Sequence, residues 1–432
     1  MPTNFVQELQ WRGLLHDLMP DTESFLSSTP TKGYIGFDPT ADSIHIGSLV
    51  QIIILMHFQK AGHTPIVLVG GATGMIGDPS GKSNERNLLD QQTLEKNCRG
   101  IQTQLEQFLN FDSSIQNPAV VVNNYDCMKS YTLIDFSRDI GKHLTVNYMM
   151  AKESVKKRLG ADSKVGMSFT EFTYQLLQGY DFLHLYNTLE CKLQMGGSDQ
   201  WGNITTGTEL IRRKEGGKAY ALTCPLIKKA DGSKFGKTEE GNVWLDKSKT
   251  SPYKFYQFWL NTSDEDALSY IKIFTFLPRE VIEEKIQEHQ TAPHLRLLQK
   301  TIAEEVTILV HGKEAYLNAV EASQILFGKT TGDSLQKLDS QTFLELFEGV
   351  PQAEVSRSLI DGGLDLVAAL ATETDFLSSN GEARRALKEN AISVNQVKVD
   401  ENFTLGVKDL IAAQYILLRR GKKNYFILKV TS

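Results

Sequence analysis

Cysteine is scarce in this sequence, and its few copies are not spaced for structural work. The 432 residues contain four cysteines, Cys98, Cys127, Cys191 and Cys224. No two of them lie at the short spacing of a metal-binding pair, and their distribution does not suggest a disulfide framework. We therefore expect a protein of a reducing compartment, the cytoplasm, that holds no metal through its own side chains.

Long apolar runs and an excess of one charge are also missing. No apolar run is long enough to cross a bilayer, and the first twelve residues lack the basic and then apolar pattern of a secretion signal. We therefore expect no membrane partner. The formal net charge of −6 argues against indiscriminate DNA binding, because such affinity comes from neutralising phosphates.

The remaining composition is that of an ordinary globular protein, long enough for two or three domains. Its charge is uneven along the chain. From Arg384 to the end there are ten Lys and Arg against four Asp and Glu, so the rest of the chain is acidic. This contrast is compatible with a nucleic-acid partner that meets a local basic surface.

One stretch near the N-terminus has the pattern of a strand, a turn and the start of a helix. Residues 33–37 are apolar, residues 38–40 stop the strand, and residues 48–60 continue as an almost wholly apolar helix. His45 and Gly47 stand at the N-terminus of that helix. Unpaired backbone N–H groups at such a place bind phosphate readily. The stretch therefore suggests nucleotide chemistry.

Three further short apolar runs read as buried strands, at residues 64–69, 120–123 and 191–195. The first of them follows the apolar helix directly, so residues 33–70 form a βαβ unit with parallel strands. Residues 220–250 read as loop. The pattern predicts an α/β domain built on a parallel sheet.

Glycine-rich turns follow two of these strands, at residues 70–83 and 196–203. The first turn matches neither the dinucleotide-binding spacing G-x-G-x-x-G nor the phosphate loop G-x-x-x-x-G-K-[ST]. It is either a flexible connection or a ligand-binding loop at the carboxyl edge of the sheet. Asp78, Lys82 and Arg86 favour the second reading, because they bring both signs of charge to one crevice.

Two other features have both a functional and a purely structural interpretation. A capping box at residues 168–171 starts a helix on which Tyr174, Gln178 and Asp181 share one face. They form either an exposed polar stripe or the polar floor of a pocket. Lys234 and Lys237 lie in a glycine-containing loop and could clamp a polyphosphate, although surface loops are often rich in lysine.

The order of these patterns predicts several domains. Strand signals disappear after residue 251, and two hairpins beside a basic helix return in the tail, which fits RNA recognition as well as a merely solvated face. The predicted divisions are residues 1–230 as the catalytic α/β domain with an insertion at about 125–167, 231–250 as a mobile loop, 251–328 as a helical domain, 329–353 as a linker, and 354–432 as a small α+β domain.

Taken together, the motifs resemble those of bacterial tyrosyl-tRNA synthetases, which belong to class I. Asp42-Ser-Ile-His-Ile-Gly-Ser48 looks like the "HIGH" signature of that class, and Lys234-Phe-Gly-Lys-Thr238 looks like its "KMSKS" loop. The similarity covers the whole chain, with the tail resembling the alpha-L RNA-binding module. The resemblance implies a Rossmann-like catalytic domain, a helical anticodon-binding domain and a small α+β RNA-binding domain.

The resemblance also implies the reaction and its partners. L-tyrosine and ATP would give tyrosyl-adenylate and pyrophosphate, and the tyrosyl group would then pass to the 3′ end of tRNA(Tyr). ATP would enter as a substrate together with Mg²⁺. Homodimerisation and a cytoplasmic location follow from the family as well.

Carried over residue by residue, the resemblance implies four functional groups. At the reacting phosphates it implies Thr40, His45, Lys82, Arg86, Lys234 and Lys237. For tyrosine it implies Tyr34, Asp78, Tyr174, Gln178, Asp181 and Gln200. For ATP it implies Gly36, Asp38, His45, Gly47, Gly197, Asp199 and Lys237. For RNA we expect Arg384, Arg385, Lys388, Arg419, Arg420, Lys422 and Lys423.

Within this scheme Tyr34 and Asp181 would hydrogen-bond the phenolic hydroxyl of the substrate. Phenylalanine would leave both of them buried and unpaired, an effect for which this family is itself the usual example. Some details depart from the family. Ile35 and Gln51 stand where some relatives carry Cys and Thr, and Asn395-Gln396 replaces the usual Asn-Gly turn.

Three rival interpretations remain to be weighed. A tryptophanyl-tRNA synthetase is disfavoured by Tyr34 and Asp181, which do not suit an indole pocket. A small-molecule adenylyltransferase is disfavoured by the helical segment and the basic tail. An RNA-binding protein with a retired catalytic domain is disfavoured by the presence of His45 and of three candidate lysines, Lys82, Lys234 and Lys237.

Overall fold

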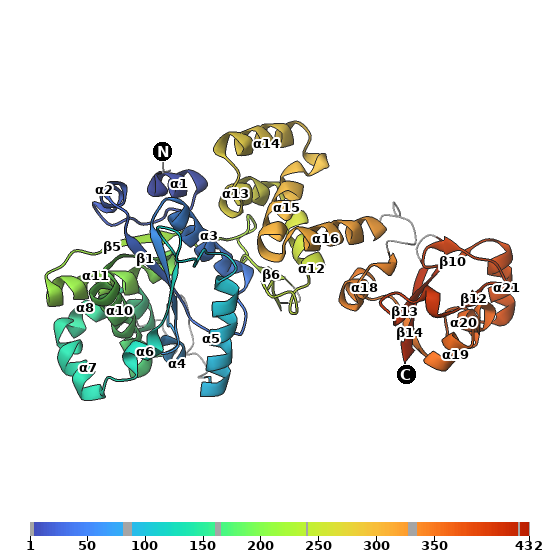
Figure 1. The fold of residues 1–432 in the computed structure, drawn as a ribbon, viewed down its shortest axis with the longest axis horizontal. Helices are drawn as coiled ribbons and strands as arrows, with labels where there is room; N and C mark the ends of the chain where they lie inside the picture. Colours follow the sequence, from blue (N-terminus) through green and yellow to red (C-terminus); the bar gives the residue numbers. More distant parts are fainter. Residues whose placement is uncertain are drawn as a thin grey trace. The chain divides into compact units, whose positions relative to one another are not determined.

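The computed structural model describes residues 4–80, 89–159, 166–238, 241–326, 335–421 and 424–431 (Figure 1). The chain forms two compact units. The first comprises Met1–Lys249 and Asn261–Ile302, and the second Thr250–Leu260 and Ala303–Ser432. The predicted helical segment 251–328 is thus divided between the two units, and the functional domain boundaries proposed from the sequence remain predictions.

The first unit is built on a five-stranded parallel sheet with the strand order β3-β2-β1-β4-β5. Its strands are β1 Lys32–Phe37, β2 Thr64–Val69, β3 Val120–Asn123, β4 Cys191–Gly197 and β5 Tyr220–Cys224. This confirms the predicted Rossmann-like α/β class. Four of the strands lie where the sequence placed them.

The fifth strand corrects one prediction. Residues 220–250 read as loop, yet Tyr220–Cys224 is a fully buried strand that pairs with β4. Its burial comes from distant segments: Phe25 stacks on Tyr220 with ring centroids 4.2 Å apart, and Leu18 bridges to Leu222. A five-residue strand covered in this way shows little alternation of its own, so its sequence pattern does not reveal it.

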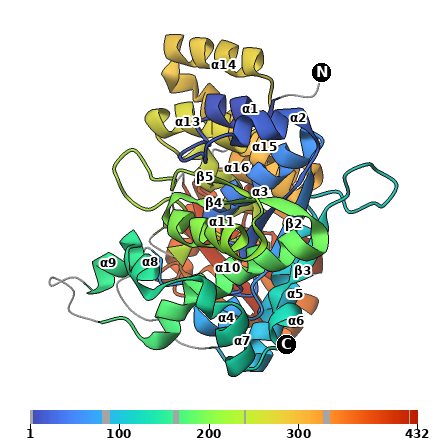
Figure 2. The ribbon, with the colours of Figure 1, turned by 90° about the vertical axis from the view of Figure 1, so that its left-hand side faces the viewer.

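Helices cover both faces of this sheet, and the alternation of strand side chains decides which residue meets which helix. Three of these helices are α3 Ile46–Lys60, α10 Phe169–Leu189 and α11 Trp201–Glu215. Gly33 faces α3, because a Cβ there would come within 2.8 Å of Phe58. The next residue, Tyr34, belongs to the core formed with α10 and α11, the two helices that face the viewer in Figure 2.

The capping box of α10 is present as predicted. Ser168 accepts a hydrogen bond from the Glu171 backbone N–H, and the Glu171 carboxylate reaches back to the N–H of Ser168. Glu171 also forms a buried ion pair with Arg158, at 2.7 Å. This pair fastens the start of α10 to α9, Glu153–Leu159.

The predicted insertion is largely helical. Between β3 and α10 the described residues form α6 Asn124–Met128, α7 Leu133–Asp139, α8 Val146–Met150 and α9 Glu153–Leu159. The other elements of the first unit are α1 Phe5–Arg12, α2 Thr22–Ser28, α4 Thr73–Ile76, α5 Gln91–Leu105, β6 Lys237–Thr238, β7 Gly241–Asn242, α13 Asp264–Phe274 and α14 Arg279–Thr291. The helix α15, Leu297–His311, runs from the first unit into the second.

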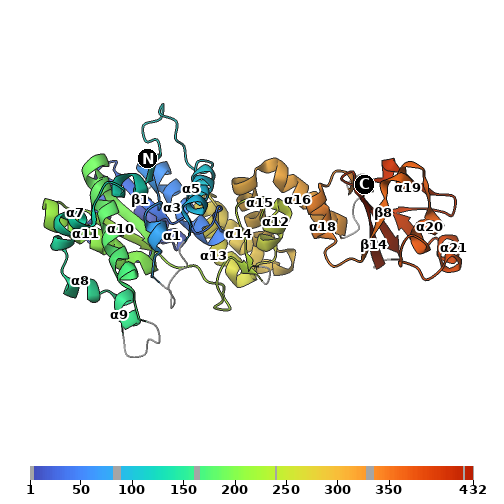
Figure 3. The same cartoon turned by 90° about the horizontal axis from the view of Figure 1, so that it is seen from below.

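The second unit combines helices with a mixed sheet ordered β11-β10-β13-β14-β8. Its helices are α12 Pro252–Leu260, α16 Lys313–Leu326, α18 Ser340–Leu346, α19 Arg357–Asp361, α20 Leu366–Ala371 and α21 Asn380–Lys388. Its strands are β8 Gln352–Ser356, β9 Leu364–Asp365, β10 Ile392–Val394, β11 Val397–Lys398, β12 Thr404–Leu405, β13 Tyr415–Arg420 and β14 Asn424–Thr431. β8 pairs with β14 in parallel, as Figure 3 allows the reader to follow.

Both predicted tail hairpins are confirmed, β10–β11 and β13–β14. The turn of the first contains Asn395 and Gln396 with φ of +46° and +67°. Two positive φ values define the turn that suits a two-residue hairpin, so the unusual Asn-Gln pair keeps the usual geometry. The Asn395 side chain supports it by bonding Asp409 O and Leu417 N, at 2.6 and 2.9 Å. Among the described residues, no helix has the length and apolar character to span a membrane.

Candidate functional site

A cavity of about 690 Å³ opens beside β1 and β4 in the first unit. This is the carboxyl edge of the sheet, where ligands bind in open parallel folds. Thirteen residues singled out from the sequence line it: Tyr34, Gly36, Asp38, Thr40, His45, Gly47, Asp78, Tyr174, Gln178, Asp181, Gly197, Asp199 and Gln200. Segments far apart in the chain therefore meet as the motifs predicted.

The buried side of the cavity has two polar atoms without hydrogen-bond partners among the described residues, the Tyr34 hydroxyl and Asp181 Oδ1. Each side chain is only 1% exposed. The other carboxylate oxygen of Asp181 accepts a bond from Asn124 Nδ2 at 3.0 Å. Burial raises the pKa of Asp181 well above the carboxyl range, with Asn124 opposing and Asp38 adding to the shift. These atoms are arranged to receive one hydroxyl that both donates and accepts.

A chain of hydrogen bonds connects this end of the cavity to Asp38. Asn124 Nδ2 also bonds Thr73 Oγ1 at 3.0 Å, and the Thr73 hydroxyl donates to Asp38 Oδ1 at 2.8 Å. The Tyr174 hydroxyl donates to Asp38 Oδ2, also at 2.8 Å. Asn124 and Thr73 were missed in the sequence. Asn124 follows β3 directly, so its place at a carboxyl strand end was the available signal.

Asp78 ties the first glycine-rich turn to the second. Gln200 Nε2 donates to its Oδ2 at 2.6 Å, and Asn203 Nδ2 reaches its Oδ1 at 3.4 Å. Burial, and after it the charge of Asp78, raises the pKa of Asp199. Gln178 adds a buried Oε1 without a partner among the described residues. This side of the cavity therefore offers acceptors to a cation.

Two glycines, Gly36 and Gly197, line the cavity without filling it. Gly36 is exposed on β1, and a Cβ there would meet only Leu68, at an ordinary 3.6 Å. A Cβ on Gly197 would come within 2.6 Å of Asp199 Oδ1. Side chains at these positions would fill the cavity or displace its acid.

His45 caps α3 as the sequence suggested. Its Nδ1 accepts a hydrogen bond from Gly47 N at 3.1 Å, so the imidazole is unprotonated at that nitrogen. Burial lowers the pKa of His45, a backbone hydrogen bond opposes this, and the charge of Lys237 lowers it further. The imidazole therefore lies at the helix N-terminus beside the cavity, but the unpaired N–H groups expected there are not free, because those of Ile46, Gly47 and Ser48 all have partners within the chain.

The segment after the lysine loop lies along the start of α3. Ile46 N donates to Val243 O at 2.8 Å, and Leu245 N donates to Ile44 O at 2.9 Å. Trp244 sits edge-on to His45, with ring centroids 6.1 Å apart. The sequence gave no indication of this pairing, because Trp244 is about two hundred residues from His45.

The predicted lysines are only partly accounted for. Lys234 and Lys237 are exposed and lie outside the cavity wall, to which Phe235 between them does contribute. Lys82 and Arg86 fall outside the described residues. Of the predicted cationic residues, Lys237 therefore lies near enough for its charge to lower the pKa of His45. The roles of Lys82 and Arg86 remain predictions.

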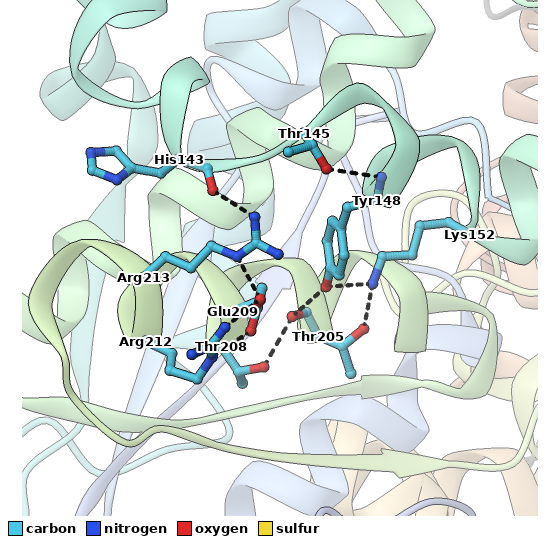
Figure 4. A network of polar contacts seen from close by, with 9 residues as sticks. All are labelled: His143, Thr145, Tyr148, Lys152, Thr205, Thr208, Glu209, Arg212 and Arg213. Carbon is cyan, nitrogen blue, oxygen red and sulfur yellow. Dashed lines mark hydrogen bonds and ion pairs between the residues drawn. The ribbon is translucent and has the colours of Figure 1, made fainter.

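A polar network joins the insertion to α11, which begins at Trp201 within the second glycine-rich segment (Figure 4). Lys152 Nζ bonds the Tyr148 hydroxyl at 2.8 Å and Thr205 Oγ1 at 3.0 Å. Glu209 pairs with Arg213 at 2.5 Å. Burial lowers the pKa of Lys152 to about 8, and Glu209 opposes the shift. The network anchors α8 and Lys152, which follows it in the insertion, on α11.

In the second unit the predicted RNA-binding residues divide into two kinds. Arg384, Arg385 and Lys388 are exposed on α21. Arg420 instead pairs with Glu382 at 2.6 Å, and Arg419 reaches Ser393 Oγ at 3.4 Å. Lys422 and Lys423 lie outside the described residues. Among the predicted RNA-binding residues that the structure describes, the exposed ones therefore all lie on α21, and Arg420 fastens this helix to the sheet.

Comparisons with known proteins agree with this geometry. The family described as "tRNA synthetases class I (W and Y)" matches residues 27–328. The "Tyrosine--tRNA ligase SYY-like C-terminal domain" matches residues 342–428. The fold and cavity are thus those of a class I aminoacyl-tRNA synthetase of the tryptophan and tyrosine group.

Relatives of known function show which of the two amino acids, tryptophan or tyrosine, this chain's family uses. The chain is 64% identical to the tyrosine–tRNA ligase of Flavobacterium psychrophilum, over 99% of both chains. It is 61% identical to that of Porphyromonas gingivalis, over 99% of this chain and 100% of the relative. The chain belongs to the family of bacterial tyrosyl-tRNA synthetases.

Solved structures give the same picture. A C-terminally truncated mitochondrial tyrosyl-tRNA synthetase of Aspergillus nidulans superimposes with a TM-score of 0.68 at 29% identity, covering 75% of this chain and 94% of its own. A tryptophanyl-tRNA synthetase of Plasmodium falciparum superimposes with a TM-score of 0.51 at 12% identity, covering 79% of this chain and 88% of its own. The second likeness concerns the fold alone.

Proposed function

We propose that this chain joins L-tyrosine to tRNA(Tyr) in two steps, with ATP as the energy source. An oxygen of the tyrosine carboxylate attacks the α-phosphorus of ATP, the bond to the β-phosphate oxygen breaks, and pyrophosphate leaves. A ribose hydroxyl of the terminal adenosine of the tRNA then attacks the carbonyl carbon of the adenylate, and AMP leaves. The carboxylate is already ionised, so the first step needs positioning and charge stabilisation rather than a protein nucleophile.

One observation carries the choice of amino acid. The Tyr34 hydroxyl and Asp181 Oδ1 are buried at the cavity without partners among the described residues. A phenolic hydroxyl would satisfy both, by donating to one and accepting from the other. An indole has a donor only, so it suits this pair less well.

The rest of the amino acid would be held by the acidic side of the cavity. Asp78, Tyr174 and Gln178 would receive the ammonium group, and Gln200 would lie near the carboxylate. Gln200 already bonds Asp78 at 2.6 Å, which keeps its amide directed into the cavity. Asp38, held by Tyr174 and Thr73, would stand near the reacting adenylate.

ATP would lie across β1 with its phosphates at the N-terminus of α3. Gly36 and Gly47 would allow close approach of the nucleotide, and Gly197 and Asp199 would bind the ribose hydroxyls. Thr40, His45, Lys234 and Lys237 would stabilise the departing pyrophosphate, with Lys82 and Arg86 approaching from the other loop. Mg²⁺ would enter with the phosphates, as it commonly does in ATP-dependent sites.

The tRNA would be met in part by α21. Its exposed Arg384, Arg385 and Lys388 can neutralise backbone phosphates without reading bases. The cytoplasm is the compartment in which we expect this reaction. Cys98, Cys191 and Cys224 are buried free thiols, which suits a reducing environment.

We also propose that the protein works as a homodimer. Large apolar side chains of the insertion and of the start of α10 face solvent in the single chain: Leu133 is 75% exposed, Ile134 77%, Val146 59% and Phe169 75%. Such a concentration of exposed apolar groups is typical of a protein interface. A solution mass equal to that of one chain would contradict the proposal.

ATP–pyrophosphate exchange with each of the twenty amino acids tests the proposed function. We expect exchange with tyrosine to exceed that with every other amino acid. Exchange that is strongest with tryptophan would favour a tryptophanyl-tRNA synthetase. If none of the twenty amino acids supported exchange, the reading as an RNA-binding protein with a retired catalytic domain would be favoured.

A further inference from the structure

The lysine loop, residues 231–238, has two buried residues between its two lysines, Phe235 and Gly236, and only Phe235 has a side chain to anchor. Phe235 is 8% exposed, whereas Lys234 and Lys237 are exposed. Its ring stacks on Phe274 with centroids 5.1 Å apart and meets Tyr270 edge-on at 5.2 Å. Aromatic pairs at such distances contribute beyond the area that they bury. The loop is therefore seated on α13 by its central residue.

A second contact joins the beginning of the loop to the same helix. Ala230 N donates to Asp266 Oδ1 at 2.8 Å, and the other oxygen of that carboxylate accepts from Ser263 Oγ at 2.8 Å. Ser263 is also the N-cap of α13 and accepts from Asp266 N at 3.0 Å. The carboxylate that receives the loop is thus held in place by the start of the helix.

The helix itself is fixed at its other end by Arg12 of α1. This guanidinium is 3% exposed and donates to Lys272 O and Thr275 O at 2.7 Å and to Leu277 O at 3.0 Å. Charge-assisted bonds to the final carbonyls stabilise a helix C-terminus. α13 is consequently a rigid support that belongs to the same unit as the sheet.

On its opposite side the loop lies against the start of α3. Gly236 has φ of +79°, and a Cβ there would come within 2.5 Å of Ile46 Cγ2. Its carbonyl accepts from Val243 N at 3.0 Å. Lys237 follows directly, and its charge already lowers the pKa of His45. The backbone between the anchored ring and the catalytic lysine is therefore very short.

We propose that Phe235, seated on Tyr270 and Phe274, is a positioning residue that sets Lys237 over the ATP phosphates. The inference rests on the proposed function, because it concerns the same activation step. Phe235 itself need not touch the phosphates. It acts by limiting the positions open to the lysine two residues further on, and such limits matter because small misplacements cost large factors in rate.

The test compares Phe235→Ala, Phe235→Leu, Lys237→Ala and the Phe235→Ala/Lys237→Ala double variant by single-turnover formation of tyrosyl-adenylate. Phe235→Ala should lower the rate by about 100-fold and leave the equilibrium binding of tyrosine unchanged. Phe235→Leu should recover most of the rate, because an apolar side chain of similar reach can still occupy the seat. In the Lys237→Ala background the loss from Phe235→Ala should shrink to a few-fold, since the lysine it positions is gone.

Phe276→Ala is the matched control. Phe276 follows α13 and packs on His57, with ring centroids 4.7 Å apart, so its loss disturbs that region without removing a ring from the loop's seat. It should leave the activation rate unchanged. Independent, additive losses in the double variant, or an equal loss of tyrosine binding in Phe235→Ala, would overturn the inference. Wild-type protein that fails to exchange with tyrosine would overturn the proposed function instead.

Discussion

At the scale of single residues, the most informative atoms are those that the folded chain leaves unsatisfied. A buried polar group without a partner costs about 1–3 kcal/mol, and the cavity has such atoms on Tyr34 and Asp181. Asn124 holds the second oxygen of Asp181, so the carboxyl cannot turn away to find another partner. A ligand hydroxyl that reaches both atoms would remove this cost.

Tyr34→Phe should reduce the preference for tyrosine over phenylalanine in ATP–pyrophosphate exchange by about 10–100-fold, because one polar partner of the phenol is lost. Tyrosyl-tRNA synthetases are the usual illustration of such selection, and the resemblance implies Tyr34 and Asp181 as the residues that make it. The structure adds that both are buried and lack partners among the described residues at these atoms. Tyr180→Phe is the control. Tyr180 directly precedes Asp181 on α10, but its ring contacts Tyr131 and Phe136. Tyr180→Phe should therefore leave the preference for tyrosine over phenylalanine unchanged. Unaltered selection in Tyr34→Phe would exclude this role.

His45 allows a prediction about pH. Burial and the charge of Lys237 lower its pKa below the ordinary value of 6.5, so the folded protein binds that proton less readily than the unfolded chain does. Stability linked to this group is therefore present above the ordinary pKa and is lost as pH falls through 6.5 and below. An NMR titration of the imidazole should give a midpoint below 6.5.

Lys237→Ala should raise that midpoint, because one cause of the shift disappears, while Lys234→Ala should leave it in place. If the His45 midpoint were the same in Lys237→Ala as in the wild type, the loop would not approach α3 in solution.

At the scale of elements, α10 illustrates how local and tertiary signals combine. Its capping box was evident in the sequence, but the partner of Glu171 was not. Arg158 lies thirteen residues upstream and bonds both carboxylate oxygens, at 3.0 and 2.7 Å. Both side chains are almost fully buried, so each depends on the other for its charge.

Arg158→Ala should destabilise the protein by about 3–5 kcal/mol, because it leaves the Glu171 carboxylate buried and unpaired. Ser168→Ala, which removes only the cap hydroxyl, should cost about 1 kcal/mol. Arg212→Ala breaks an exposed pair with Glu209 and should cost no more than about 1 kcal/mol. Urea-unfolding transitions of the three variants give the comparison. Equal costs for Arg158→Ala and Arg212→Ala would contradict the importance of burial.

At the scale of the whole molecule, the cavity and the basic helix belong to different units of the chain. The cavity lies in the first unit, whereas α21 belongs to the second. β8, which begins at Gln352, pairs with β14 near the end of the chain. A truncation meant to remove the tail should therefore begin before Gln352, because a later cut would leave an orphan strand.

Charge reversal avoids that difficulty. The combined Arg384→Glu, Arg385→Glu and Lys388→Glu variant should form tyrosyl-adenylate at the wild-type rate and charge tRNA(Tyr) about 100-fold less efficiently at moderate salt, because phosphate contacts are lost. Lys398→Glu with Lys408→Glu, in the same unit but outside α21, should have a much smaller effect. Charging that survives the triple reversal would remove α21 from the RNA-binding surface.

The sequence by itself determined the features that depend on near neighbours. The strand, turn and helix around His45, the capping box at Ser168 and the two tail hairpins all have local signatures, since propensity, capping and turn chemistry act over a few residues. The order of the motifs determined the family, and with it the two-step reaction.

Only the tertiary structure decided how distant segments complete the site. β5 owes its burial to Phe25 and Leu18. Asn124 bonds Asp181, and Phe235 packs against α13, about forty residues further on. These contacts join residues whose separation along the chain follows no period, and whether a polar side chain is buried without a partner depends on everything packed around it. A residue pattern indicates which environment each side chain favours, whereas packing in the folded core determines which polar atoms find partners and which stay unpaired at the cavity.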